Sequence, residues 1–326
     1  MPTVTAILAA AVPTAIYSLL LWWLDRYEKE PLSLILVAFL WGALPAIAIA
    51  VVFELVLAVP LEHSTLGPGV AAWGLAPLVE EPIKALALAG LFRFARYEFD
   101  GPLDGIVYGA LIGFGFSMTE NLLYFLRYDG LDTLFWVRSV VFGLNHAFFT
   151  SMVGLALGAV RYGRSRWLNA LALTGGLALA ILFHALHNFV VRYEFAGLFL
   201  SWLIQSGGVL VVLAVAALAW RNERHRMEQE LGEEVLAGVL AAREYAEITS
   251  SPKRARRQFE ALLAGGWARY RKVRRFHHLA TELAFRKWQC RLQDDCHPAE
   301  ECSRLRAAIV ELRAGLQREE SAWGEL

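Results

Sequence analysis

The chain has 326 residues, of which 57% are hydrophobic and 19% are charged, and its formal net charge at pH 7 is zero. A soluble globular protein contains about 45–50% apolar residues, so the composition excludes a protein that is soluble throughout, and the neutral charge gives no indication of nucleic-acid binding. The apolar excess ends near Trp220, and the remainder is rich in charge. We therefore predict an all-α protein, with a polytopic membrane helix bundle over residues 1–220 and a helical cytoplasmic tail over residues 221–326.

Apolar runs recur along the first region, where a membrane-spanning helix needs about 20 residues. Seven runs satisfy that length, and we expect seven or eight transmembrane helices. The runs are Val4–Leu24, Leu32–Val59, Ala71–Phe94, Leu103–Leu126, Leu134–Val160, Leu168–Val191 and Gly197–Trp220. Pro45 lies in the middle of the second run, which is long enough to tilt or kink. No Lys or Arg precedes the first run, which favours a membrane helix over a cleaved signal peptide, although Ala-rich Leu8–Ala11 leaves cleavage open.

Basic residues between the runs predict the orientation of the chain. Most of them lie beside the ends of the first, third, fifth and seventh runs: Arg26, Lys29, Arg93, Arg96, Arg161, Arg164, Arg166, Arg221, Arg224 and Arg226. The opposite ends have only Arg127, Arg138 and Arg192. Cytoplasmic loops carry the excess of Lys and Arg. We expect a multi-pass plasma-membrane protein with its N-terminus outside and its C-terminus in the cytoplasm.

Polar side chains of four predicted helices occur at one depth. At 1.5 Å per residue they share a slab roughly 5–15 Å below the outer surface. They are Glu80, Glu81, Glu120, Asn121, Asn145, His146, His184, His187 and Asn188. Scattered polar residues would not agree in depth, and ionisable residues inside a membrane indicate function. The sequence therefore predicts one buried site.

Glu80, Glu81 and Lys84 form the first candidate group. A charged residue in hydrocarbon costs roughly 2.5–3.5 kcal/mol on insertion scales. Glu80 and Lys84 are spaced i,i+4 on one helical face, and Glu81 points about 100° away, toward another helix. Pro82 removes a backbone donor and clashes with the carbonyl of Leu78, so we expect a kink. The alternative is a buried ion pair that only fixes helix register.

Further candidates lie on the following helices. Glu120 adds a third acid to the site. Two carboxylates in one low-dielectric site cannot both ionise easily, which suits general acid/base catalysis. The alternative is that Glu120 simply bonds Lys84 or a histidine. His184 and Asn188 share a helical face and can donate to a developing oxyanion, and the alternative is a polar clasp between helices. The accessory polar groups are Lys84, Asn121, Asn145 and His146.

The same side chains can hold a divalent metal. Carboxylates and imidazoles are ligands of Zn²⁺, and the set that we expect is Glu81, Glu120, His146 and His184. Their spacing is not His-Glu-x-x-His, so the chain has no such zinc signature. The sequence leaves the cofactor open, with Zn²⁺ as one option.

These segments resemble, in order, those of the PrsW-type intramembrane proteases. Glu80-Glu81-Pro82-Ile83-Lys84 is similar to the EExxK motif, Phe116–Glu120 to FxxxE, and His184–Asn188 to HxxxN/D, while His146–Thr150 matches a further segment. The resemblance covers roughly residues 1–220 and extends to the larger group that includes the CAAX prenyl endopeptidases. It implies that Glu80 activates water, that Glu81 and Glu120 support it, and that His184 and Asn188 form the oxyanion hole. It also implies a membrane-anchored substrate, similar to an anti-sigma factor, that is cut near the extracytoplasmic side.

Two other classes of protein can use a buried polar site. A non-catalytic binder needs no set of acids and histidines at one depth, and a transporter is expected to contain internal repeats, of which none is clear. A degenerate peptidase that binds single-span partners without cutting them is a third alternative. The expected partners are membrane lipids and a single-span membrane protein substrate, and no nucleic acid.

The tail is predicted to be helical, with a break at Thr249–Pro252 and a turn at Asp294–Pro298. Lys253–Arg257 and Arg269–Arg275 are basic with interleaved apolar residues, so they can lie on anionic lipid, bind an acidic partner or form a solvated face. The three cysteines, spaced by six, imply neither a disulfide framework nor a zinc site; they are Cys290, Cys296 and Cys302. We expect a helical hairpin or coiled coil for regulation or for homo-oligomer formation.

Overall fold

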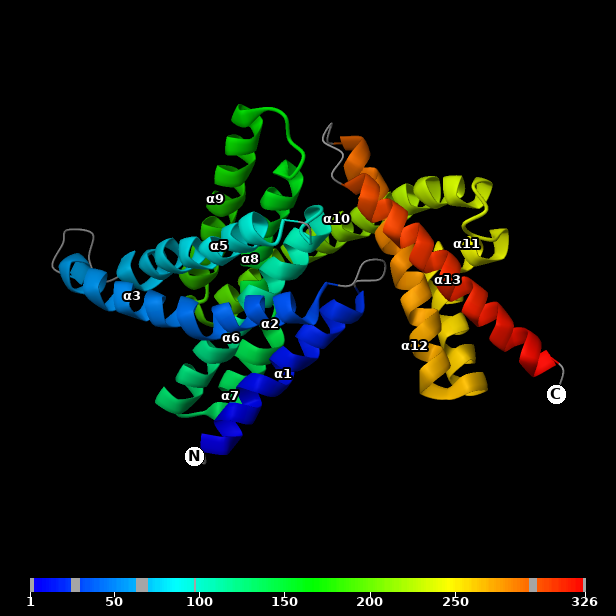
Figure 1. Cartoon of the computed structure of the whole chain (residues 1–326). Coiled ribbons are helices and arrows are strands. Elements are labelled where there is room, and N and C mark those ends of the chain that lie inside the picture. The colour runs from blue at the N-terminus through cyan, green and yellow to red at the C-terminus, as the bar shows by residue number, and fades with distance from the viewer. Residues whose placement is uncertain (1–2, 25–29, 63–69, 97, 293–297, 325–326) are drawn as a thin grey trace. The chain divides into compact units, whose positions relative to one another are not determined.

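The structure is a computed structural model that describes residues 3–24, 30–62, 70–96, 98–292 and 298–324. These residues form helices and contain no strand, so the predicted all-α class is confirmed. Figure 1 follows the helices along the chain. Two compact units are present: Met1–Leu24 with Glu30–Ala217, and a second that takes in Leu218–Leu326.

The first unit contains the apolar helices. They are α1 (Thr3–Leu24), α2 (Leu32–Trp41), η1 (Gly42–Ala46), α3 (Ile47–Glu62), η2 (Ala71–Leu75), α5 (Ala76–Phe94), α6 (Pro102–Arg127), α7 (Leu131–Leu134), η3 (Phe135–Val141), α8 (Asn145–Val160), α9 (Arg166–Val190) and the first part of α10 (Glu194–Leu236). Six spans are long and apolar enough to cross a membrane: Thr3–Trp23, Leu32–Leu57, Pro102–Arg127, Leu131–Val160, Arg166–Val190 and Glu194–Leu236. The expected seventh span is η2 with α5, which is less apolar because it contains Glu80, Glu81, Lys84 and Arg93.

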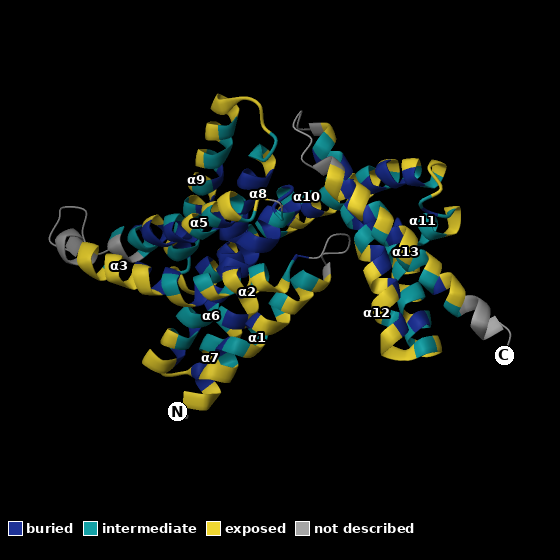
Figure 2. Cartoon of the chain, viewed as in Figure 1, coloured by how far each residue is buried: buried dark blue, intermediate teal, exposed yellow. Residues whose placement is uncertain are grey.

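Helices α6 and α8 lie at the centre of this unit, where buried residues gather in Figure 2. Their backbones approach closely at glycines. A Cβ atom added to Gly105 would lie 1.9 Å from the carbonyl oxygen of Gly154, and one added to Gly113 would lie 2.3 Å from that of His146. A side chain at these positions would hold the helices apart, so the glycines allow this close packing.

Three of the predicted helices are irregular. The second is interrupted by the π-helical turn η1, which contains Pro45. The third begins with the π-helical turn η2, and α5 continues through Pro82 as helix. The fifth is not one helix, because η3 ends at Val141 and α8 begins only at Asn145. Such backbone is tolerated at membrane depth where protein groups satisfy it, and the Thr119 hydroxyl donates to the carbonyl of Ala43 in η1 at 2.7 Å.

The second unit contains the end of α10, α11 (Ala242–Ile248), α12 (Ser251–Leu292) and α13 (Pro298–Gly324). Its own apolar core includes Met227, Leu231, Ile248, Leu283 and Ile309. The predicted break appears between α11 and α12, and Pro298 starts α13. Cys290 and Cys302 form no disulfide with each other, and Cys296 lies outside the described residues.

Candidate active site

Four helices of the first unit bring the predicted ionisable residues together. Glu80, Glu81 and Lys84 come from α5, Glu120 from α6, His146 from α8 and His184 from α9. Glu81 and Lys84 have no solvent-exposed surface, and Glu120 is the most exposed of the six, with 20% of its side chain accessible. We call these six residues the polar cluster. Because charged groups are costly in such an environment, each needs a partner.

Lys84 is the cation at the centre of the polar cluster. Its ammonium Nζ donates to Glu80 Oε2 and to Glu81 Oε1, both at 2.9 Å. The same atom lies 3.7 Å above the centre of the Phe116 ring. The predicted i,i+4 pair is therefore present, and the neighbouring acid shares the same cation.

Glu81 also reaches two neighbouring helices, α9 and α8. His184 Nδ1 lies 2.9 Å from Glu81 Oε1, and the Thr150 hydroxyl donates to Oε2 at 3.4 Å. Both oxygens of Glu81 are therefore occupied. Glu80 is less engaged: apart from Lys84, it approaches, within the described residues, only His184, whose Nδ1 lies at 4.0 Å.

His146 connects Lys84 to Glu120. Its Nδ1 lies 3.1 Å from Lys84 Nζ, and its Nε2 lies 2.9 Å from Glu120 Oε2. An ammonium group only donates, so Nδ1 accepts, and Nε2–H donates to the carboxylate. The two contacts fix one neutral tautomer of His146.

Glu120 has a second partner in Arg138, which is on η3. Arg138 Nη2 donates to Glu120 Oε2 at 2.6 Å, and its Nε donates to Asn121 Oδ1 at 2.9 Å. The guanidinium also lies 3.7 Å from the centre of the Tyr124 ring. This arginine is thus fixed on three sides at the outer edge of the cluster.

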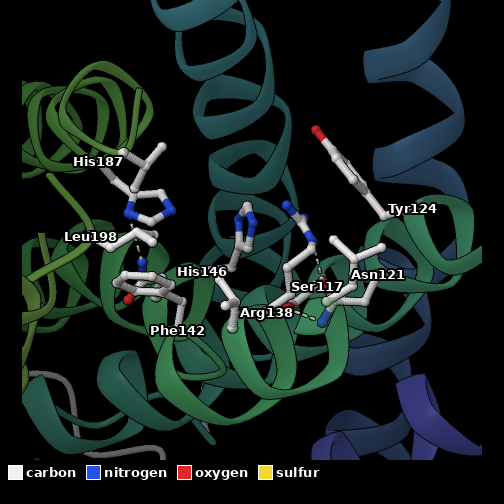
Figure 3. Close-up of a pocket in the computed structure, with 12 residues that line it drawn as sticks. Ser117, Asn121, Tyr124, Arg138, Phe142, His146, His187 and Leu198 are labelled. Carbon is white, nitrogen blue, oxygen red and sulfur yellow. Dashed lines mark hydrogen bonds between the residues drawn. The ribbon is translucent and has the colours of Figure 1, made fainter. Parts of the chain in front are cut away.

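A pocket opens beside the cluster. Its volume is about 270 Å³, and Figure 3 shows His146 between Arg138, Asn121 and Ser117 on one side and Phe142, His187 and Leu198 on the other. The remaining lining residues are Tyr124, Leu134, Val137, Asn145 and Val191. The break between η3 and α8 borders the pocket. Phe142 directly follows η3, Asn145 begins α8, and both residues line the pocket. The pocket therefore gives a ligand access to the imidazole of His146.

Comparison with known proteins identifies the family. The model of the PrsW family, described as intramembrane metalloproteases, matches residues 30–221, more than half of the chain. The chain belongs to the PrsW family. By that membership it is an intramembrane peptidase, as the sequence predicted.

Three curated relatives of this PrsW family member are named Protease PrsW. The protein of Geobacillus kaustophilus is 36% identical over 42% of this chain and 59% of its own length. Those of Shouchella clausii and Bacillus subtilis are each 29% identical, over 58% and 57% of this chain and over 84% and 83% of their own lengths. The chain thus spans less than two thirds of the first relative and more than four fifths of the other two. No solved structure matches the chain significantly.

The donor groups of the polar cluster fit the metal that the family description implies. Glu80, Glu81, His146 and His184 each offer one ligand atom, and these atoms lie within 4.8 Å of one another. Two carboxylates and two imidazoles suit Zn²⁺ or a similar divalent ion. The set predicted from the sequence contained Glu120, whereas the structure has Glu80 in its place. Glu120 instead contacts Nε2 of His146, the nitrogen on the side away from Lys84. A carboxylate in that position orients a ligand imidazole.

Two residues of the sequence prediction lie differently from what was expected. Asn188 is half-buried and makes no side-chain hydrogen bond within the described part of the chain. Its neighbour His187 is the one that lines the pocket, with its Nδ1 2.6 Å from Ser201 Oγ and 3.3 Å from Asn145 Nδ2. The i,i+4 spacing predicts that His184 and Asn188 lie on one face of their helix, but it does not predict which neighbouring helix each side chain contacts.

Arg138 is a site residue that the sequence analysis did not predict, because there it served only as one of the basic residues that indicate orientation. It lies inside the predicted span Leu134–Val160, and an arginine within an apolar span is itself a signal of function. Because a charged residue inside a span needs a partner, the position of Arg138 predicts an acidic partner such as Glu120.

Proposed function

We propose that this intramembrane peptidase is an endopeptidase that hydrolyses a single-span membrane protein of the anti-sigma-factor type, with water activated by Glu80. The observation that carries the proposal is the buried cluster of two carboxylates and two imidazoles beside an accessible pocket. Peptide hydrolysis needs a base for water and donors for the oxyanion.

Glu80 is the carboxylate best placed to act as the base. Glu81 uses both oxygens for Lys84, His184 and Thr150. Glu80 Oε2 accepts from Lys84, whereas its Oε1 has no hydrogen-bond partner among the described residues. A free carboxylate oxygen can accept a proton from water, while Lys84 holds the other oxygen of Glu80 in place.

Glu81, His146 and His184, together with one oxygen of Glu80, would hold a divalent metal, which leaves the other oxygen of Glu80 for the water. A bound ion of this kind polarises a carbonyl and lowers the pKa of bound water. Glu120 would keep its contact with His146 Nε2 and so fix the direction of that imidazole.

The pocket provides the groups for the substrate backbone. Asn121, Arg138 and Asn145 line it with side-chain N–H donors. We assign the oxyanion-binding role to such pocket donors rather than to Asn188, because Asn188 does not line the pocket. The apolar side chains of Phe142 and Leu198 supply the opposite wall for an unfolded segment of a membrane helix.

The proposed side of cleavage is extracytoplasmic. The support is the excess of Lys and Arg at alternate ends of the predicted spans, which places the cluster in the outer half of a plasma membrane. The N-terminus would be outside and the C-terminus in the cytoplasm.

Cleavage of a single-span peptide with an extracellular stub by the purified full chain tests the proposal. We expect Glu80→Gln and His184→Ala to cut at least about 100-fold more slowly than the wild type. Asp132→Asn, an exposed acid on α7, is the matched control and should cut normally. Equal cutting by all four proteins would overturn the site assignment, and tight peptide binding without cleavage by the wild type would favour the non-catalytic binder.

A further inference from the structure

The second unit carries an exposed apolar surface at a bend of α12. The helix has two arms that meet at Gly265–Gly266, where Gly266 has the positive φ of +64° that favours glycine. The arms are antiparallel, as Figure 1 shows, and the Gln258 side chain on one arm donates to His277 Nδ1 on the other at 3.2 Å. α12 is therefore a helical hairpin, and the bend is its tip.

Three large apolar side chains lie exposed near this tip. Phe259 is 59% exposed, Leu263 is 71% exposed and Trp267 is 60% exposed. Phe259 and Leu263 are spaced i,i+4 and so share a face of the first arm. We call Phe259, Leu263 and Trp267 the tip surface. Its members stay outside an apolar core that the same unit builds from other side chains.

Basic residues lie directly behind the tip surface on both arms. Residues 251–275 contain nine Lys and Arg residues and one acid, Glu260. On the first arm Arg256 precedes Phe259 by one turn, and on the second arm Arg271 and Arg274 follow Trp267 at i+4 and i+7. Arg271 and Arg274 are exposed and form no ion pair within the described residues.

An anionic bilayer surface matches this arrangement. Trp side chains favour the membrane–water interface, and basic residues nearby are attracted by anionic headgroups. An acidic protein or a nucleic acid would engage the arginines but would give Phe259 and Leu263 no apolar layer to enter. The unit also follows a candidate span directly, because α10 continues without a break from that span into the second unit.

We infer that the hairpin tip of α12 docks on an anionic lipid surface. Phe259, Leu263 and Trp267 enter the interfacial layer, while Arg271 and Arg274 contact the headgroups; Arg256 is paired with Glu260 at 2.8 Å. This interaction is independent of the peptidase site, and it makes the position of the tail dependent on lipid charge.

A fluorescent reporter at Leu263 in the full chain tests the inference. The background carries Cys290→Ser, Cys296→Ser and Cys302→Ala, and Leu263→Cys is labelled with a polarity-sensitive dye. Val310→Cys, 48% exposed on α13, is the matched control. In nanodiscs that contain phosphatidylglycerol, we expect the label at position 263 to emit at shorter wavelength than in discs of phosphatidylcholine alone, and the label at position 310 to be unchanged. No lipid-dependent shift at position 263 would overturn the inference.

A charge-reversed variant tests the electrostatic part separately. Each basic residue close to an anionic surface strengthens binding by about fivefold. Arg271→Glu with Arg274→Glu should therefore abolish the shift at position 263, and high salt should weaken it in the parent chain. Because both arginines are exposed, the unit should still fold, which an unchanged spectrum of the label at position 310 would verify. A shift that persists in the charge-reversed variant would refute the docking by lipid charge.

Discussion

Replacing Lys84 by methionine tests whether its ammonium group neutralises the buried acids. Lys84 is fully buried, and Nζ lies 2.9 Å from a carboxylate oxygen of both Glu80 and Glu81. Methionine has a similar length and no charge, so both carboxylates lose their common partner. Breaking a buried ion pair by removing one member costs about 3–5 kcal/mol. We expect Lys84→Met to lower the free energy of unfolding by that amount.

The loss should affect Glu80 more than Glu81. Glu81 keeps His184 Nδ1 at 2.9 Å and the Thr150 hydroxyl at 3.4 Å. Within the described residues, Glu80 keeps only the longer contact with His184 Nδ1, at 4.0 Å. Neutralising Glu80 in the same chain should therefore restore stability, and Lys84→Met/Glu80→Gln should recover at least about 1 kcal/mol relative to Lys84→Met.

Thermal unfolding in detergent with a chelator present measures this effect, because no bound metal can then replace the ammonium. A change of 1 kcal/mol moves the Tm of a unit of this size by about 2–4 °C, so Lys84→Met should melt on the order of 10 °C below the wild type. Lys253→Met, at an exposed position of α12, is the control and should melt with the wild type. The reasoning is refuted if the double variant melts no higher than Lys84→Met.

Three further predictions concern the metal, the helix packing and the tail. Wild-type protein should retain a divalent metal on desalting, as measured by plasma mass spectrometry, and His184→Ala should lose it. Gly154→Ala should be destabilising by about 1–3 kcal/mol, because its Cβ would lie 1.8 Å from the Gly105 carbonyl oxygen, whereas Gly175→Ala meets nothing within 4 Å and should be neutral or stabilising in the same melting assay. Burial, aided by neighbouring arginines, lowers the pKa of His277 from 6.5 to about 3. Below pH 6.5 His277 of the unfolded tail therefore binds a proton that His277 of the folded tail does not. The free energy of unfolding should fall by about 1.4 kcal/mol per pH unit as the pH drops toward 3. Hydrogen exchange of α12 should show this slope in the wild type and not in His277→Gln.

The sequence could predict the meeting of the ionisable residues because the reason for it is local. An isolated charge in an apolar span is costly, so several such charges at one depth must satisfy one another. Five members of the polar cluster form a chain of hydrogen bonds from Glu120 through His146, Lys84 and Glu81 to His184, and Glu80 joins this chain at Lys84. The i,i+4 pair of Glu80 and Lys84 followed from helix geometry alone.

What the sequence could not predict depends on the packing between helices. The interruption between Val141 and Asn145 has no proline, and its apolar residues read as a continuous span. Which acid faces which nitrogen of His146 also depends on the rotation of α6 and α5 about α8. For this reason the sequence predicts Glu120 as a metal ligand where the structure has Glu80. It also predicts Asn188 as a site residue, whereas the structure has His187 lining the pocket.

The close packing at glycine also sets the chemistry of the site. A Cβ atom at Gly113 would lie 2.3 Å from the carbonyl oxygen of His146, so only glycine lets α6 approach α8 at the turn that bears this histidine. Glu120 lies two turns further along α6, and its 2.9 Å contact with His146 Nε2 depends on the same separation. If α6 moved outward, Nε2 would lose its acceptor, and with it the contact that fixes the tautomer in which Nδ1 accepts from Lys84 of α5. Gly113 of α6 therefore helps to determine the orientation of a candidate metal ligand on α8, although glycine has no side chain that could bind a ligand itself.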